Sequence, residues 1–170
     1  MKKLFIILIG CCIFAGCTEY KVKKLYEQGQ NYEKQFEWDK AVETYNIILK
    51  SYPKSQIAPQ AQLDMAQCKE KIDKIDKLIN ETDKLLNSKK YESAIKNMED
   101  ILKLGIQHSK RDTIERNLDL TKLNLADEYY SKKGNKNKTK AFTLFKELAE
   151  KGYSYAQYSV GFMLQNGQGT

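Results

Sequence analysis

The stretch from Leu25 to Ser55 constrains the fold more than any other part of the chain. Apolar and small residues recur at helical spacing on both sides of a short break at Phe36-Glu37. Asp39 is predicted to cap the second helix, because its carboxylate can accept from the N–H groups of the first turn. Pro53 is predicted to end that helix, because the residue before a proline is displaced from the helical region. The stretch therefore predicts a helical hairpin, which cannot cover its outer face alone and implies a stack of hairpins.

The pattern of this hairpin resembles the tetratricopeptide repeat. The signature positions of that repeat are occupied here by Gly29, Tyr32, Ala41, Tyr45, Ile48 and Pro53. Trp38 lies at the aromatic site before the second helix. Leu25 and Gln28 depart from the family, which prefers Trp and Leu there. The resemblance implies an all-α solenoid of helical hairpins.

The resemblance also implies a place where a partner could bind. In a tetratricopeptide hairpin the first helix lines the concave side, and here it presents Lys23, Tyr26, Gln30 and Glu33. We hypothesise that these four residues form a partner-binding groove for a protein or peptide, with Tyr26 as its anchor.

Composition limits the class of protein. The chain has 170 residues, of which 30% are charged and 41% hydrophobic, and only two prolines. These values favour one all-helical domain over a membrane bundle or a disordered chain. Without its first 16 residues the net charge falls from +7 to +5, because Lys2 and Lys3 leave. That modest excess indicates a solvated lysine-rich surface, and nucleic acid is not expected as a partner.

The N-terminus has the features of an export signal. Basic residues at Lys2 and Lys3 precede an apolar run that is too short to span a bilayer. The run ends in Ala15-Gly16-Cys17, which resembles the lipobox of bacterial lipoproteins, although Phe14 replaces the usual Leu. In that class the cysteine sulfur is diacylated, with fatty acids such as palmitate, and the signal is cut just before it. Cys11 is a weaker alternative because its apolar run has only about six residues. An uncleaved anchor helix or an ordinary signal peptide is the remaining alternative.

These features predict the domain order. Residues 1–16 are a lipoprotein signal peptide, residues 17–21 a lipidated tether, and residues 22–170 a helical repeat domain. Thr18 follows the cysteine where a retention signal would have Asp. In diderm bacteria this implies the outer membrane, so the expected location is the cell envelope, facing the periplasm.

Beyond the first hairpin, residues 22–55, the sequence predicts long helices. From Ser55 to Ser88, mostly apolar residues recur alternately every three and four positions, which predicts one amphipathic helix with Pro59 in its first turn. These residues are Ala58, Ala61, Met65, Cys68, Ile72, Ile75, Ile79, Thr82 and Leu86. The opening Tyr52–Ala66 resembles repeats of barrel-assembly outer-membrane lipoproteins and of periplasmic cell-division coordinators. A second helix follows at Tyr91, Ala94, Met98 and Ile101, and closes a hairpin of residues 56–104.

The last segment, residues 109–170, resembles the Sel1-like repeat. A helix from about Asp112 to Ser131 carries an apolar stripe, and a polar loop is expected from Lys132 to Lys140. The matching positions are Lys140–Phe142, Leu148–Gly152, Ala156, Val160-Gly161 and Asn166–Gly169. Gly152 fits the site just after a helix end. The last repeat is expected to be incomplete, which leaves Tyr155, Tyr158 and Phe162 among uncovered apolar residues. We therefore expect Ser154–Thr170 to mediate self-association or to fray.

Few residues suggest chemistry. Cys11 and Cys12 leave with the signal and Cys17 is acylated, so Cys68 remains alone, as an expected core residue. A single histidine, His108, gives no metal or haem pattern, and no cofactor is expected. The acidic pairs Glu99-Asp100 and Asp127-Glu128 are interpreted as solvated helix faces.

The sequence thus predicts a membrane-anchored scaffold for protein–protein interaction, and not an enzyme. One alternative is a subunit of an outer-membrane barrel-assembly-like complex, on the resemblance of Tyr52–Ala66. The other is an envelope enzyme such as a peptidoglycan hydrolase, for which no catalytic arrangement is found.

Overall fold

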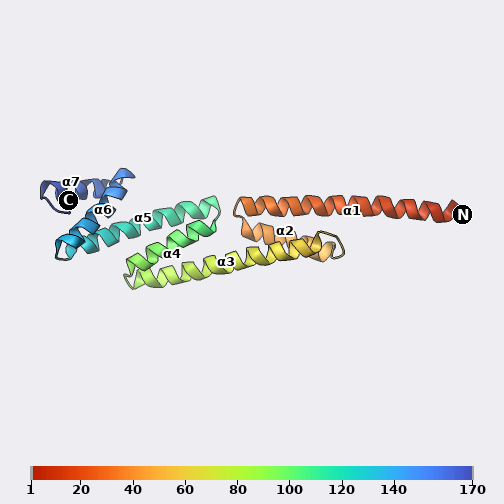
Figure 1. Ribbon diagram of the computed structural model, residues 1–170, viewed down its shortest axis with the longest axis horizontal. Coiled ribbons are helices and arrows are strands. Elements are labelled where there is room, and N and C mark those ends of the chain that lie inside the picture. Colours follow the sequence, from red (N-terminus) through yellow and green to blue (C-terminus); the bar gives the residue numbers. More distant parts are fainter. Residues whose placement is uncertain (1, 170) are drawn as a thin grey trace. The chain divides into compact units, whose positions relative to one another are not determined.

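The computed structural model describes residues 2–169, with side chains from Thr18 onward. Within that range every regular element is an α-helix (Figure 1). The helices are α1 (Lys2–Lys34), α2 (Trp38–Ser51), α3 (Ala58–Asn87), α4 (Tyr91–Leu104), α5 (His108–Ser131), α6 (Asn135–Glu150) and α7 (Ser154–Gln165). Consecutive helices pack as hairpins, α1 on α2, α4 on α5, α5 on α6 and α6 on α7. The predicted all-α hairpin solenoid is confirmed.

The contacts of the chain divide into two compact units. The first unit ends at Asp76 and the second begins at Lys77, so α3 contributes residues to both. The predicted boundaries of signal peptide, tether and repeat domain stay predictions. Among the described residues no helix is both long enough and apolar enough to cross a bilayer.

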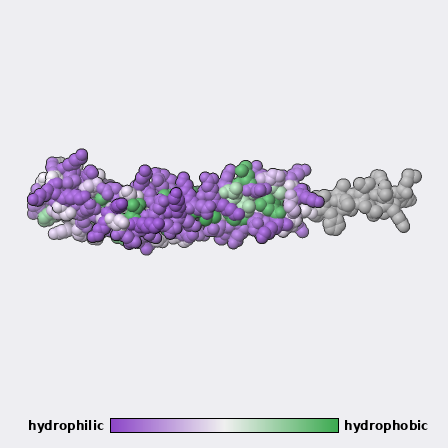
Figure 2. All heavy atoms as spheres, turned by 90° about the horizontal axis from the view of Figure 1, so that it is seen from below, coloured by the Kyte–Doolittle hydropathy of each residue, from purple (hydrophilic) through white to green (hydrophobic). Residues whose placement is uncertain are grey.

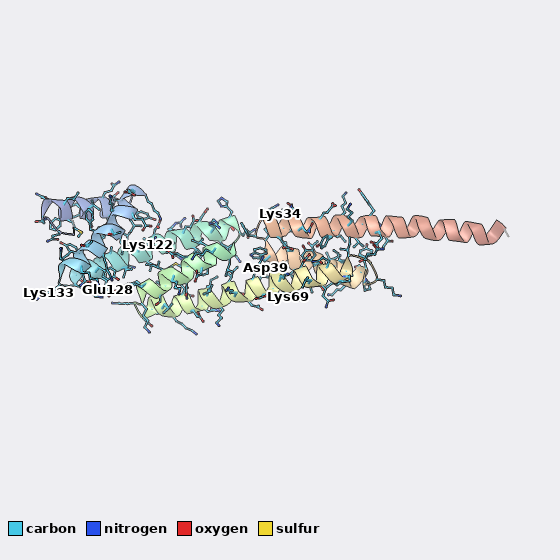
Figure 3. All side chains as sticks on the ribbon, in the orientation of Figure 1. Lys34, Asp39, Lys69, Lys122, Glu128 and Lys133 are labelled. Carbon is cyan, nitrogen blue, oxygen red and sulfur yellow. The ribbon has the colours of Figure 1, made fainter. Side chains whose placement is uncertain are left out.

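The surface follows from the amphipathic helices. Charged side chains such as Lys34, Lys69 and Lys133 are exposed (Figure 3). The face drawn in Figure 2 is mostly hydrophilic, and apolar side chains gather on it in only a few places. Burying one stripe of each helix and leaving the opposite stripe in water is what the sequence period predicts.

In the first unit, α1 and α2 approach closely at Gly29. A Cβ atom built there would lie 2.5 Å from Cε1 of Tyr45, so any larger residue would collide with that ring. The absence of a side chain at Gly29 therefore makes room for the ring of Tyr45. Ala41, Tyr45 and Ile48 are fully buried, as the hairpin pattern predicts.

The prediction that Asp39 caps α2 is wrong. Glu37 is the N-cap residue and Trp38 begins the helix, so Asp39 lies in the first turn. The chain reverses at Phe36, which has φ of 57°, and the N–H of Glu37 bonds to the carbonyl of Tyr32. This tight turn brings the backbone into the helix before Asp39 is reached. The negative charge of the Asp39 carboxylate still stabilises α2, because it lies near the positive N-terminal end of the helix dipole.

The observed end of α2 and the observed extent of α3 agree with the prediction from the sequence. Helix α2 ends at Ser51, before Pro53, and α3 is continuous with Pro59 in its first turn. Cys68 is a free, fully buried thiol, which confirms its expected place in the core.

The second unit has one clear difference from the prediction. The prediction of a polar loop from Lys132 to Lys140 is wrong, because only residues 132–134 are irregular and α6 begins at Asn135. Polar residues do not prevent a helix, and Gly134, with φ of 103°, supplies the turn before it. Gly152 has φ of 92° just after the end of α6, so its predicted helix-ending role is confirmed.

Two small cores hold the second unit together. The first joins α4 to α5 and contains Ala94, Met98 and Leu118. The second joins α5, α6 and α7 through Ala126, Ala141, Phe145, Leu148, Ala156 and Met163. The second core positions the groove described below.

Candidate functional site

The four residues of the predicted groove are separated by the structure into two pairs. The hydroxyl of Tyr26 donates to Oδ2 of Asp64 on α3 at 2.6 Å, and Glu33 accepts from the hydroxyl of Tyr45. The side chains of Lys23 and Gln30 are exposed. Tyr26 and Glu33 therefore hold helices together, whereas Lys23 and Gln30 are exposed, with the side chain of Gln30 also hydrogen-bonded to Tyr26.

Burial raises the pKa of both tyrosines of this network above the ordinary value of 10.0. It raises the pKa of Tyr26 to about 12, and the hydrogen bond to Asp64 adds to the effect. Burial also raises the pKa of Tyr45, with a further contribution from the hydrogen bond to Glu33. The rings lie 5.7 Å apart between centroids, so Tyr26 and Tyr45 form one packed unit. Both hydroxyls remain hydrogen-bond donors at neutral pH.

Cys68 lies beside this network and allows a direct test of its burial. Burial raises the pKa of the Cys68 thiol to about 11. Only the thiolate reacts, and a pKa of about 11 in place of the ordinary 9.0 lowers the thiolate fraction roughly hundredfold at pH 8, while burial also hinders access of the reagent. In a chain with Cys11, Cys12 and Cys17 replaced by serine, labelling should be at least about tenfold slower in the folded protein than in urea.

A matched control moves the single thiol to the surface. Ser88 is exposed, so a chain carrying Ser88→Cys and Cys68→Ser should be labelled at nearly the same rate in both states. Equal rates for Cys68 in the folded and unfolded chain would contradict its burial.

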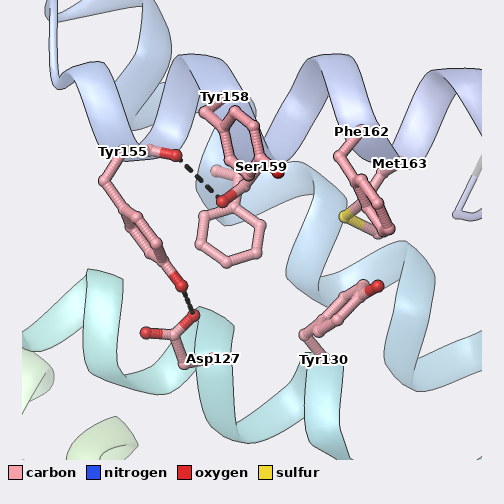
Figure 4. Close-up of a pocket in the computed structure, with 8 residues that line it drawn as sticks. Asp127, Tyr130, Tyr155, Tyr158, Ser159, Phe162 and Met163 are labelled. Carbon is pink, nitrogen blue, oxygen red and sulfur yellow. Dashed lines mark hydrogen bonds between the residues drawn. The ribbon is translucent and has the colours of Figure 1, made fainter.

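A second candidate site is an aromatic groove in the second unit (Figure 4). Its cavity volume is about 240 Å³. Helices α5, α6 and α7 contribute its lining: Asp127, Tyr130, Phe145, Tyr155, Tyr158, Ser159, Phe162 and Met163. Below, "aromatic groove" means these eight residues.

The floor and the rim of the aromatic groove differ in exposure. Phe145 and Met163 are buried in the core, with 2% and 1% of their surface exposed. Tyr155, Tyr158 and Phe162 are exposed at 53%, 70% and 42%. Exposed large apolar residues in a cluster commonly mark interaction surfaces. The apolar strip that the sequence predicts on the last helix is therefore present, while self-association through it stays a prediction.

Ring contacts and hydrogen bonds fix the rim. The rings of Tyr158 and Phe162, one helical turn apart, stack with centroids 6.4 Å apart, and Tyr155 meets Phe145 edge-on at 6.1 Å. The hydroxyl of Tyr155 donates to Oδ1 of Asp127 at 2.7 Å and so links α7 to α5 (Figure 4). This hydrogen bond is the main cause of the raised pKa of Tyr155.

Tyr130 is held in place by a cation from α6. The ammonium of Lys138 lies 3.5 Å from the centroid of the Tyr130 ring and donates to the Tyr130 carbonyl at 2.6 Å. A cation over an aromatic face stabilises both groups. The ring is thereby fixed at the edge of the aromatic groove.

Sequence reasoning did not place Asp127 or Tyr130 on this surface. Asp127 was interpreted as part of a solvated face, and it is indeed exposed, but it also accepts from Tyr155. Tyr130 lies next to Tyr129 on α5, and the helical period alone does not say which of the two faces α7. The only signal in the sequence was the cluster of tyrosines itself.

Comparison with known protein families gives a match within the first hairpin. Residues 25–55 match the family model of the tetratricopeptide repeat. These residues form the α1–α2 hairpin with its close contact at Gly29. Over these residues the chain is similar to a tetratricopeptide repeat, and the observed helical hairpin agrees with that similarity; repeats of this kind support protein–protein interaction. The comparisons find no curated protein and no solved structure that matches the chain.

Proposed function

We propose that this protein is a lipid-anchored scaffold of the bacterial cell envelope, which holds a protein partner close to a membrane. The observation that carries the scaffold role is the tetratricopeptide match at residues 25–55, in a chain built of helical hairpins. Such repeats present helix faces to partner segments, and the chain has two such faces. One contains Lys23 and Gln30, and the other is the aromatic groove.

The proposal of a lipid anchor rests on the sequence. A basic start, a short apolar run and Ala15-Gly16-Cys17 support acylation of Cys17. The side chain of Cys17 lies outside the described residues. Thr18 at the next position supports the outer membrane, with the repeat domain in the periplasm.

The scaffold role can be tested on the full chain in its own membrane. Chemical crosslinking followed by purification and mass spectrometry should recover one or a few proteins reproducibly with this chain. Recovery of barrel-assembly components would favour a role in such a complex. If no protein is enriched over a membrane protein of equal abundance, the scaffold proposal fails.

We also propose that the protein binds its partner without transforming it. Purified full-length chain should release no products from peptidoglycan. Sustained turnover of cell-wall substrate would contradict this part of the proposal.

The exposed pair on α1 gives a specific prediction. The double variant Lys23→Glu, Gln30→Glu should reduce partner recovery about fivefold or more, because it reverses charge on the proposed binding face. The hydroxyl of Tyr26 is left unchanged, since it bonds to Asp64 and its removal would disturb the fold. Recovery is measured by quantitative mass spectrometry after crosslinking.

The same helix offers a matched control. Lys24→Glu, Gln28→Glu makes the same chemical changes at exposed positions on another side of α1. Partner recovery should be nearly unchanged in this control. An equal loss in both variants would show that overall charge, and not this face, determines binding.

A further inference from the structure

The aromatic groove combines an apolar wall with a single charged group. Six of its eight lining residues are aromatic or methionine, and Asp127 alone carries a charge. The chain as a whole has a net charge of +7. Asp127 therefore places a negative charge in the groove of a protein that is otherwise basic, while Lys138 at its edge is already engaged with the ring and the carbonyl of Tyr130. This arrangement favours a partner segment of positive charge.

Asp127 retains capacity for such a partner. Its Oδ1 atom accepts the hydrogen bond from Tyr155. Among residues 18–169, no lysine or arginine forms an ion pair with Asp127. Because a carboxylate can accept several hydrogen bonds, its second oxygen can receive an incoming ammonium or guanidinium. The exposed ring of Tyr158 offers an additional face for such a cation.

The size of the cavity indicates what fills it. At about 240 Å³ it is smaller than the sites that enclose small-molecule ligands, which typically measure roughly 300–1,000 Å³. Phe145 and Met163 form an apolar floor with no charged group. A large apolar side chain suits this space better than a polar cofactor.

We propose that the aromatic groove binds a partner peptide segment in which an apolar side chain fills the cavity and an adjacent lysine or arginine pairs with Asp127. This inference rests on the scaffold function proposed above and specifies the chemistry of the segment that is bound. Aromatic floors that take one apolar anchor, flanked by a charge pair at the rim, account for both affinity and selectivity in such interfaces.

The test is a differential selection from a random-peptide phage library. The target is the full chain in nanodiscs of uncharged lipid, either wild type or Phe162→Ser. Peptides that bind lipid are selected by both targets and are therefore subtracted. Peptides specific to wild type should combine a large apolar residue with a neighbouring Lys or Arg. A selection dominated by acidic peptides, or one without wild-type-specific peptides, overturns the proposal.

Two matched pairs of variants then test the contacts with one selected peptide. Phe162→Ser should abolish binding, whereas Leu164→Ser, which removes an exposed residue of α7 outside the aromatic groove, should retain it. Asp127→Asn, which keeps an acceptor for Tyr155, should weaken binding about tenfold. Asp83→Asn, at an exposed position of α3, should change affinity less than about twofold. Equal effects within either pair overturn the proposal, provided that circular dichroism shows all variants folded.

The two proposals fail in different ways. If crosslinking still recovers the partner from Phe162→Ser and Asp127→Asn at wild-type levels, the scaffold role stands and the aromatic groove is not its binding site. If peptides bind as expected but no envelope partner is recovered, the scaffold role fails while the chemistry of the groove stands.

Discussion

Replacement of Cys17 by serine should leave the precursor unacylated and uncleaved. The sulfur is the proposed acceptor of the diacylglyceryl group, and the signal is cut only after that modification. Each buried methylene contributes about 0.8 kcal/mol, so one acyl chain binds a bilayer marginally, whereas two or three chains hold it almost permanently. The expected mature wild-type protein begins at an acylated Cys17. Mass spectrometry of the intact protein measures both the mass and the N-terminus.

Two neighbouring cysteines supply the control. Cys11→Ser and Cys12→Ser change the same atom within the apolar run, and both variants should mature normally. If Cys11→Ser blocks maturation and Cys17→Ser does not, the alternative site at Cys11 is correct. A mature N-terminus at any other residue would contradict the lipoprotein assignment.

The second large effect is expected at Tyr45. This side chain is fully buried, contacts Gly29 and Tyr26, and donates to Glu33. Truncation of a buried aromatic residue to alanine costs about 3–5 kcal/mol, because it loses apolar burial and leaves a cavity. It also removes the donor from the Glu33 carboxylate. Tyr45→Ala should therefore lower the free energy of unfolding of the first unit by about 3–5 kcal/mol.

The single tryptophan of the chain allows the unfolding of the first unit to be followed separately. Trp38 begins α2 and is buried, so its fluorescence during urea unfolding reports on the first unit. Tyr45→Phe keeps the ring and removes only the hydroxyl, and it should cost about 1–2 kcal/mol. Tyr20→Ala makes the same change as Tyr45→Ala at a side chain that is 66% exposed, and its effect should stay within about 0.5 kcal/mol. Similar losses at Tyr20 and Tyr45 would contradict the packing described here.

Much of the helical architecture could be predicted because it depends on local spacing. Small residues at Gly29 and Ala41, and apolar residues such as Ile48 at helical intervals, specify a hairpin through their positions in the chain alone. Pro53 and Gly152 mark helix ends through their own backbone preferences. The starts of two helices differed from the prediction. Glu37 and not Asp39 occupies the N-cap position of α2, and α6 begins inside a polar run, since both starts depend on how the preceding turn directs the chain.

The candidate sites depended far more on tertiary structure. The sequence by itself determined the hairpins, their buried stripes and the candidate acylation site at Cys17. Only the tertiary structure paired Tyr26 with Asp64, 38 residues away, and Tyr155 with Asp127, 28 residues away. A helical period specifies which residues share a face, but it leaves open the rotation and offset of one helix against the next. Those two quantities decide which hydroxyl reaches which carboxylate, and therefore whether a tyrosine supports the fold or lines a groove.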